Sequence, residues 1–103
     1  METLNLPELI SFDEKKPIFR TLFQVSGSRV SILCVRAGQT VPEHSAPGPI
    51  IVQALSGRAT FYDGVEPFEM SPGALLRLDG SRPHRVEAQE DTALLVTIFS
   101  ASA

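Results

Sequence analysis

The stretch LSGRATFYDGVEPFEMSPGALLRLDGSRPHRVEA, residues 55–88, alternates short apolar runs with turn residues. The runs are RATFY, VEPFEM, ALLRL and HRVEA, and the turn sequences DG, SPG and DGS separate them. Asp-Gly between two strand-like runs is a strong hairpin signal, because glycine adopts the positive φ that tight hairpin turns require. The stretch therefore predicts four consecutive strands joined by short turns.

The same pattern of apolar runs separated by turn residues continues on both sides of this stretch. Further apolar runs, rich in Val, Ile and Phe, occupy residues 18–25, 29–35, 50–55 and 92–99. No segment keeps a 3.6-residue apolar period for 12 residues, so no long helix is expected. The segment NLPEL at 5–9 is compatible with a short helical turn that has Pro7 near its start. Eight or nine short strands with regular turns predict an all-β, antiparallel sandwich or barrel.

Length and charge narrow the class of protein. The chain has 103 residues, which predicts a single domain over 1–103, with a polar N-terminal arm at 1–16. A net charge of -3 disfavours nucleic acid and anionic membranes as partners, since both attract clustered Lys and Arg. No apolar run reaches the length of a membrane span, and we expect no signal peptide. The single cysteine, Cys34, cannot form an intrachain disulfide, so we expect a cytoplasmic protein.

Two of the predicted strands are apolar on both faces. RVSILCV at 29–35 and IIVQAL at 50–55 lack the polar alternation of a strand with one solvated face. One face can line a barrel interior, and the other needs a second sheet, a terminal segment or another subunit. Because a chain of this length supplies little cover of its own, the pattern predicts a homodimer.

The two histidines are the first candidates for a site. His44 follows the turn at Gly38, and His84 follows the turn at Gly80. In a small barrel, strands distant in sequence can point side chains at one interior spot. Neutral imidazole is a common metal ligand and also a proton carrier. Two unrelated histidines in the core or on the surface remain the plainer alternative.

The spacing around both histidines resembles the two motifs of the cupin superfamily, whose small members are RmlC-like jelly-roll barrels. The first motif is G-x5-H-x-H-x3-4-E-x6-G, and Gly38, His44 and Gly57 match it, while Ala46 and Ile50 replace its second histidine and its glutamate. The second motif is G-x5-P-x-G-x2-H-x3-N. Gly73 and His84 match its first glycine and its histidine. Its proline, second glycine and asparagine are replaced by Asp79, Ser81 and Ala88.

The resemblance covers residues 29–99, the barrel core, and implies an antiparallel jelly-roll barrel with a ligand pocket open at one end. It also implies that His44 and His84 are the remaining two of four metal ligands. The loss of the carboxylate removes the ligand best suited to iron or manganese. Two imidazoles with waters would hold a divalent ion such as Zn, Ni, Fe or Cu only weakly, and the alternative of no metal stays open.

Strand alternation assigns further residues. Counted from His44, Ile50 and Val52 face the pocket, whereas Gln53 and Glu43 face outward unless the register shifts at APGP, residues 46–49.

Two more side chains have a candidate role. Arg82 shares the alternation of His84, so it is a candidate for the barrel mouth, where a guanidinium could hold a carboxylate or phosphate; because Pro83 can break the strand there, a solvated turn arginine is the favoured alternative. Cys34 is expected to be a buried structural thiol rather than a soft ligand or reactive group.

Three functions remain open. The first is a barrel that binds a small molecule, with a weak or degenerate metal site at His44 and His84. The second is a metal-dependent enzyme of the cupin kind, such as a dioxygenase, isomerase or decarboxylase. The third is a regulatory or sensor domain that contacts a partner through its outer sheet. The missing glutamate and second histidine favour the first.

Overall fold

The structure is a computed structural model and describes residues 1–100. Within this range the chain forms one four-residue helix, α1 (Leu6–Leu9), and nine strands. The strands are β1 (Ile18–Val25), β2 (Ser28–Val35), β3 (Thr40–His44), β4 (Ile50–Ser56), β5 (Ala59–Asp63), β6 (Glu66–Met70), β7 (Leu75–Leu78), β8 (His84–Ala88) and β9 (Thr92–Ile98). In this part of the chain, no helix is long and apolar enough to cross a membrane.

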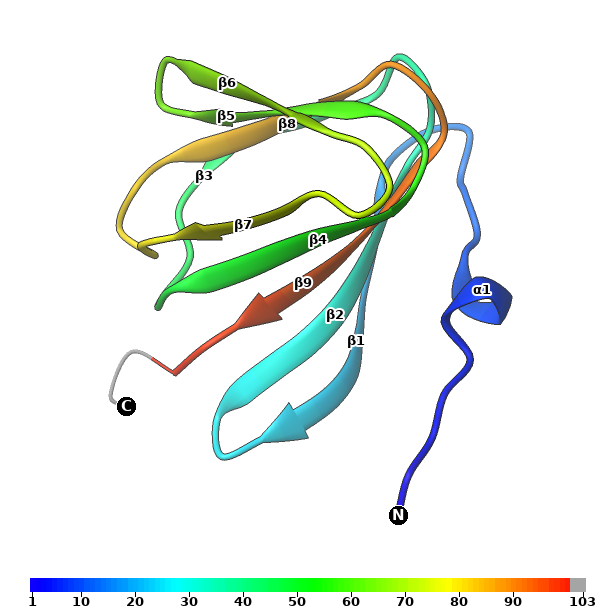
Figure 1. The fold of residues 1–103 in the computed structure, drawn as a ribbon, viewed down its shortest axis with the longest axis vertical. Coiled ribbons are helices and arrows are strands. Elements are labelled where there is room, and N and C mark those ends of the chain that lie inside the picture. Colours follow the sequence, from blue (N-terminus) through cyan, green and yellow to red (C-terminus); the bar gives the residue numbers. More distant parts are fainter. Residues whose placement is uncertain (101–103) are drawn as a thin grey trace.

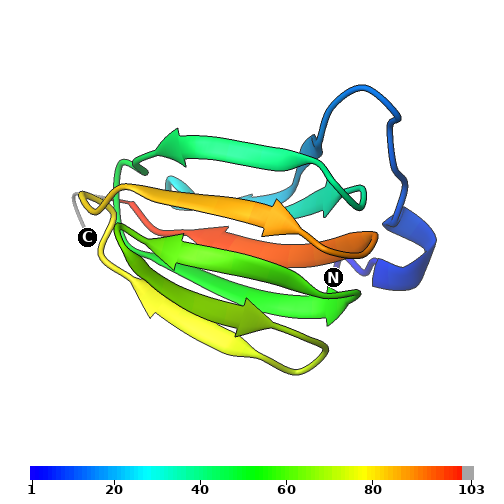
Figure 2. The same cartoon turned by 90° about the horizontal axis from the view of Figure 1, so that it is seen from above.

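The strands form two antiparallel sheets that face each other (Figures 1 and 2). The larger sheet has the order β1-β2-β9-β4-β7, and the smaller has the order β3-β8-β5-β6. Strands close in sequence often lie in opposite sheets, as β3 and β4 do, so the chain crosses between the layers several times. The prediction of an all-β antiparallel jelly-roll barrel is confirmed, and α1 is the short N-terminal helical turn.

One strand, β3, lies outside the eight apolar runs found in the sequence. Its sequence TVPEH has little apolar alternation and contains Pro42. A proline removes a hydrogen-bond donor and is therefore tolerated at a sheet edge, and β3 is an edge strand of the smaller sheet. The register between β3 and β8 also shifts between Val41 and His44, next to the proline.

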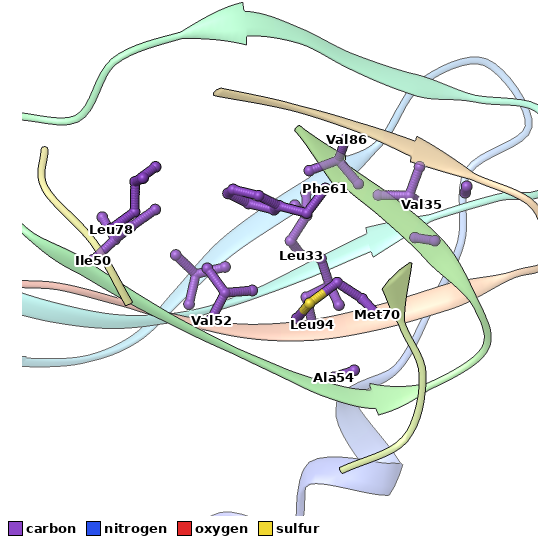
Figure 3. Close-up of a cluster of buried hydrophobic side chains, with 13 residues drawn as sticks. Leu33, Val35, Ile50, Val52, Ala54, Phe61, Met70, Leu78, Val86 and Leu94 are labelled. Carbon is purple, nitrogen blue, oxygen red and sulfur yellow. The ribbon is translucent and has the colours of Figure 1, made fainter. Parts of the chain in front are cut away.

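The main core lies between the two sheets, where apolar side chains from both layers converge (Figure 3). Its buried members are Leu33, Val35, Ile50, Val52, Ala54, Ala59, Phe61, Met70, Leu78, Val86, Ala88, Leu94 and Val96. On each strand these residues sit at alternate positions, as expected for strands with one face turned to the interior.

A second, smaller cluster covers the outer face of the larger sheet. The buried Ile32, Cys34 and Ala93 pack there against partly buried side chains of the N-terminal segment, among them Leu9 and Phe12. In Figure 1 this segment, with α1, runs alongside the larger sheet. We expected the chain to supply little cover for the strands that are apolar on both faces. This expectation is corrected, because the N-terminal segment covers part of the outer face of β2 and β9.

Candidate functional site

The two histidines lie on neighbouring strands at one end of the barrel. His44 is the last residue of β3, His84 is the first residue of β8, and the two are paired in the sheet register. Their ring centroids are 4.2 Å apart with an interplanar angle of 64°, an edge-to-face arrangement. The other side of the His84 ring stacks on Phe61 at 5.5 Å and 13°. The structure therefore brings the two sequence-predicted histidines into direct contact.

A hydrogen bond to the backbone fixes the tautomer of each imidazole. His44 Nδ1 lies 2.9 Å from the carbonyl oxygen of Pro42, and His84 Nδ1 lies 3.2 Å from that of Arg82. A carbonyl oxygen only accepts hydrogen bonds, so each neutral ring carries its proton on Nδ1 and its lone pair on Nε2. Metal-ligating histidines are commonly oriented in this way. Both Nε2 atoms are therefore available to a ligand, as hydrogen-bond acceptors or as donors of an electron pair to a metal.

The surroundings of His84 favour its neutral form. Burial lowers its pKa from the ordinary value of 6.5, because the apolar interior disfavours the imidazolium. The backbone hydrogen bond to Arg82 and the charge of Asp63 act in the opposite direction, whereas the charge of His44 lowers the pKa further. The net effect keeps the His84 lone pair unprotonated at neutral pH.

A close contact between two glycines fixes the connections that carry the histidines. A Cβ atom placed on Gly80, in the β7–β8 connection, would lie 2.0 Å from the carbonyl oxygen of Gly48, in the β3–β4 connection. The amide of Ala46 also donates to the carbonyl of Gly80 at 3.0 Å. Only a residue without a side chain allows this approach at Gly80, which holds the segments after His44 and before His84 against each other.

A cavity of about 470 Å³ adjoins the histidine pair. Most of its walls are apolar, and among residues 1–100 its ionisable lining residues are Arg29, His44 and His84. The apolar lining comes from both sheets and from the β3–β4 connection, and it includes Phe19, Leu33, Val41, Ala46, Ile50, Val52, Phe61, Val86, Leu94, Val96 and Ile98. A mostly apolar hollow with a few polar groups is typical of a small-molecule site.

Four of the five residues expected in the pocket line this cavity: His44, His84, Ile50 and Val52. Arg82 does not. It lies in the exposed turn before β8, where its Nε donates to Asp63 Oδ1 at 2.6 Å. The expectation for Arg82 is corrected on this point, because Pro83 interrupts the strand alternation on which it depended and the neighbouring carboxylate engages the guanidinium.

The donor atoms present do not fit the four-ligand metal site of the motif. Ala46 and Ile50 face the cavity at the positions of the missing ligands and offer only hydrocarbon. Gln53 and Glu43 are exposed, and Cys34 is buried beneath the N-terminal segment on the opposite face of the larger sheet. Across residues 1–100, no group of three His, Cys, Asp or Glu side chains could hold a metal ion.

Arg29 is a charged residue of the cavity lining that the sequence analysis did not identify. It lies on β2 at the same alternation as Leu33, and both line the cavity. Arg29 is the one charged residue of the run RVSILCV, at 29–35. Because the rest of the run is mainly apolar on both faces, alternation alone did not indicate which face is interior. The pairing of Arg29 with Ile98 on β9 places it on the inner face.

Comparison with known proteins found no matching protein-family model and no matching curated protein. Among solved structures, an RmlC-like cupin protein of Desulfovibrio desulfuricans superposes with a TM-score of 0.86 at 31% identity, over 95% of this chain and 95% of that chain.

Two further solved structures are similar in fold. A cupin superfamily protein of Desulfitobacterium hafniense DCB-2 gives a TM-score of 0.85 at 19% identity, over 96% of this chain and 91% of its own. A Ralstonia eutropha JMP134 protein is named only provisionally as a mannose-6-phosphate isomerase. It superposes with a TM-score of 0.83 at 24% identity, over 98% of this chain and 100% of its own. These two identities support the fold alone, whereas the 31% identity to the Desulfovibrio protein, along nearly the whole of both chains, shows that this chain belongs to the cupin superfamily.

Proposed function

We propose that this protein binds a small organic molecule in its barrel, against the His44–His84 pair, without needing a tightly held metal. The observation that carries the proposal is the cavity of about 470 Å³, which has apolar walls and two imidazoles on one side. This volume lies in the range of about 300–1,000 Å³ that is usual for ligand pockets. Ala46 and Ile50, at two ligand positions of the family motif, add apolar contact surface instead of metal ligands.

The histidines would act on such a ligand as hydrogen-bond acceptors. Each Nδ1 proton is engaged by a backbone carbonyl, so a hydroxyl or N–H group of the ligand would donate to an Nε2 atom. Burial of His84 keeps this acceptor neutral near pH 7. The lone free cysteine, Cys34, supports the further proposal of a cytoplasmic location, where thiols stay reduced.

A metal-dependent enzyme, of the dioxygenase, isomerase or decarboxylase kind, is the second candidate. It is favoured by one observation: both histidines have the Nδ1–carbonyl hydrogen bond that orients metal-ligating imidazoles. A third protein ligand is usual for catalytic metal sites, and within residues 1–100 the side chains around this cavity do not supply one. For this reason we place binding ahead of catalysis.

Titration with N-phenyl-1-naphthylamine, an uncharged fluorescent probe of apolar cavities, tests the proposal. The wild-type protein should bind one probe per chain. Val52→Phe, which fills the cavity from β4, should weaken binding by at least about tenfold, a difference of about 1.4 kcal/mol. Gln53→Phe adds the same ring at the next, outward-facing position of β4 and is the matched control. Unchanged affinity in Val52→Phe, or no binding to the wild type, would contradict the proposal.

A further inference from the structure

Within residues 1–100, all but one of the arginine side chains have a polar partner. Arg20, Arg36, Arg58, Arg77, Arg82 and Arg85 each hydrogen-bond or ion-pair with an acceptor of the protein. The side chain of Arg29 makes no hydrogen bond or ion pair to any residue within 1–100, although the chain contains 12 acidic side chains. It is also half-buried and lines the cavity. A partly desolvated guanidinium without a protein acceptor is available to an anionic ligand.

Sheet register places Arg29 at the same end of the barrel as the histidines. Arg29 pairs with Ile98, and Ile98 pairs with Ile50, so these residues form one row across the larger sheet. In the smaller sheet, His44 and His84 form the corresponding row. The β3–β4 connection, residues 45–49, joins the two rows and brings them to the same end (Figure 1). The cavity thus has hydrogen-bond donors of Arg29 on one wall and the histidines on the other.

The charge of the cavity lining is positive. No Asp or Glu side chain among residues 1–100 lines it, and the Arg29 guanidinium contributes a positive charge. The rest of the lining is mainly apolar, including Ile50, Val52 and Leu94. An ionised oxygen acceptor with an apolar body therefore complements these walls better than a neutral or cationic molecule does.

We propose that the cavity selects an amphipathic organic carboxylate, whose carboxylate binds Arg29 and whose apolar body packs between the two sheets. This inference rests on the proposed function and adds the chemical class of the ligand. A guanidinium presents two parallel N–H groups to the two oxygens of a carboxylate, a geometry that gives directional binding. One guanidinium balances the single charge of a carboxylate, whereas a phosphate monoester carries a charge of about −1.5 to −2 and three acceptor oxygens. The carboxylate is therefore favoured over the phosphate.

The test compares probes that share a shape and differ in charge. Affinities of 2-naphthoate, 2-naphthamide and 2-naphthyl phosphate are measured by calorimetry for the wild type, Arg29→Gln and Arg29→Lys. Naphthoate should bind the wild type at least about tenfold more tightly than naphthamide, since a hydrogen bond to a charged group is stronger than one between neutral groups. Arg29→Gln should remove this preference because it weakens naphthoate binding far more than naphthamide binding, while Arg29→Lys should retain part of the preference. Arg77→Gln removes the same charge from an exposed site on β7 and should change nothing.

The outcomes separate this inference from the proposed function. If neither naphthoate nor naphthamide binds, the binding function itself fails and the inference fails with it. If both bind equally well, or if Arg29→Gln keeps the preference, the cavity binds small molecules but Arg29 does not select a carboxylate. Tighter binding of naphthyl phosphate than of naphthoate would overturn the choice of carboxylate. Retained naphthamide binding by Arg29→Gln also shows that this variant is folded.

Discussion

His44 and His84 meet edge to face, with ring centroids 4.2 Å apart, at the point where β3 ends and β8 begins. Each imidazole donates its Nδ1 proton to the carbonyl two residues earlier in its own strand or turn. Both rings are therefore held by the backbone before any ligand arrives. The pair has the orientation of a metal site but lacks the third and fourth ligands, since Ala46 and Ile50 stand in their places.

The first prediction concerns metal affinity. Wild-type protein purified without a metal column should contain sub-stoichiometric zinc, nickel, iron or copper, because two imidazoles alone bind such ions weakly. Chelation should remove the ion with little change in melting temperature, whereas a tightly bound ion would stabilise the fold by mass action. The double variant Ala46→His/Ile50→Glu should raise affinity for nickel or zinc by at least about tenfold, or 1.4 kcal/mol.

His84→Ala controls this experiment, because it should remove metal binding from both backgrounds. Metal content and affinity are measured by mass spectrometry of the elements and by chelator competition. One equivalent of metal that survives prolonged chelation of the wild type would contradict the prediction and would favour the enzyme hypothesis.

Stability should fall as the pH drops below about 6.5. Burial lowers the pKa of His84 in the folded protein, so in the unfolded chain, with its ordinary pKa of 6.5, the imidazole takes up a proton first. Protonation then favours unfolding, and the loss grows as the pH falls from 6.5 toward the lower pKa of the folded state. Urea unfolding at pH 7.5, 6.5 and 5.5 measures this. His84→Gln should show a weaker dependence over the same range, and identical slopes for the two proteins would rule out His84 as the cause.

Much of the fold could be predicted from the sequence because its strands are short and separated by turn residues. The run at 18–25 coincides with β1, and HRVEA coincides with β8. The edge strand β3 could not be found in this way, since Val41 is its only aliphatic residue and Pro42 interrupts any alternation. The pairing of β2 with β9, which joins Cys34 to Ala93, depends on contacts between distant segments that no local pattern encodes.

Counting alternate positions from His44 placed two residues in the pocket, although the count crosses the connection at 45–49 between the two sheets. These residues are Ile50 and Val52, and both line the cavity. Arg82 is separated from His84 by a proline, and its ion pair with Asp63 depends on a partner strand that the sequence does not reveal. Arg29 is at the start of a strand that is buried on both faces, so only the packing of the N-terminal segment on one face identifies the other as interior.

Cys34 should react slowly with thiol reagents in the native protein. Its side chain is 2% exposed and lies beneath Leu9 and Phe12 of the N-terminal segment. Phe12→Ala should speed labelling by 5,5′-dithiobis(2-nitrobenzoate) and reduce stability by about 1–3 kcal/mol, because it uncovers the outer cluster. Glu14→Ala, at an exposed position of the same segment, is the control. Rapid stoichiometric labelling of the wild type would show that the segment does not protect the thiol.

The homodimer remains a prediction, although the N-terminal segment covers part of the surface on which it was based. Several large apolar side chains are still exposed, among them Phe68 at 48%, Leu75 at 62% and Val65 at 89%. Exposed apolar groups near one another often mark an interface. Light scattering at tens of micromolar should give twice the chain mass of 11.2 kDa. A mass of one chain, independent of concentration, would contradict the dimer.

Gly80→Ala should damage the site from outside the cavity. A methyl group at this position would lie 2.0 Å from the carbonyl oxygen of Gly48, so the two connections must separate. The cost should be about 1–3 kcal/mol of stability, as for other overpacked positions. Because the connection at 45–49 follows His44 directly, probe affinity should fall as well. Gly64→Ala is the control for the loss of backbone freedom, because a methyl group at Gly64 would meet open space. The φ of Gly64 is +65°, so this variant should also lose some stability. Probe titration and urea unfolding of both variants measure the effects. If Gly80→Ala bound the probe as tightly as Gly64→Ala does, the contact between Gly80 and Gly48 would not be what positions the histidines.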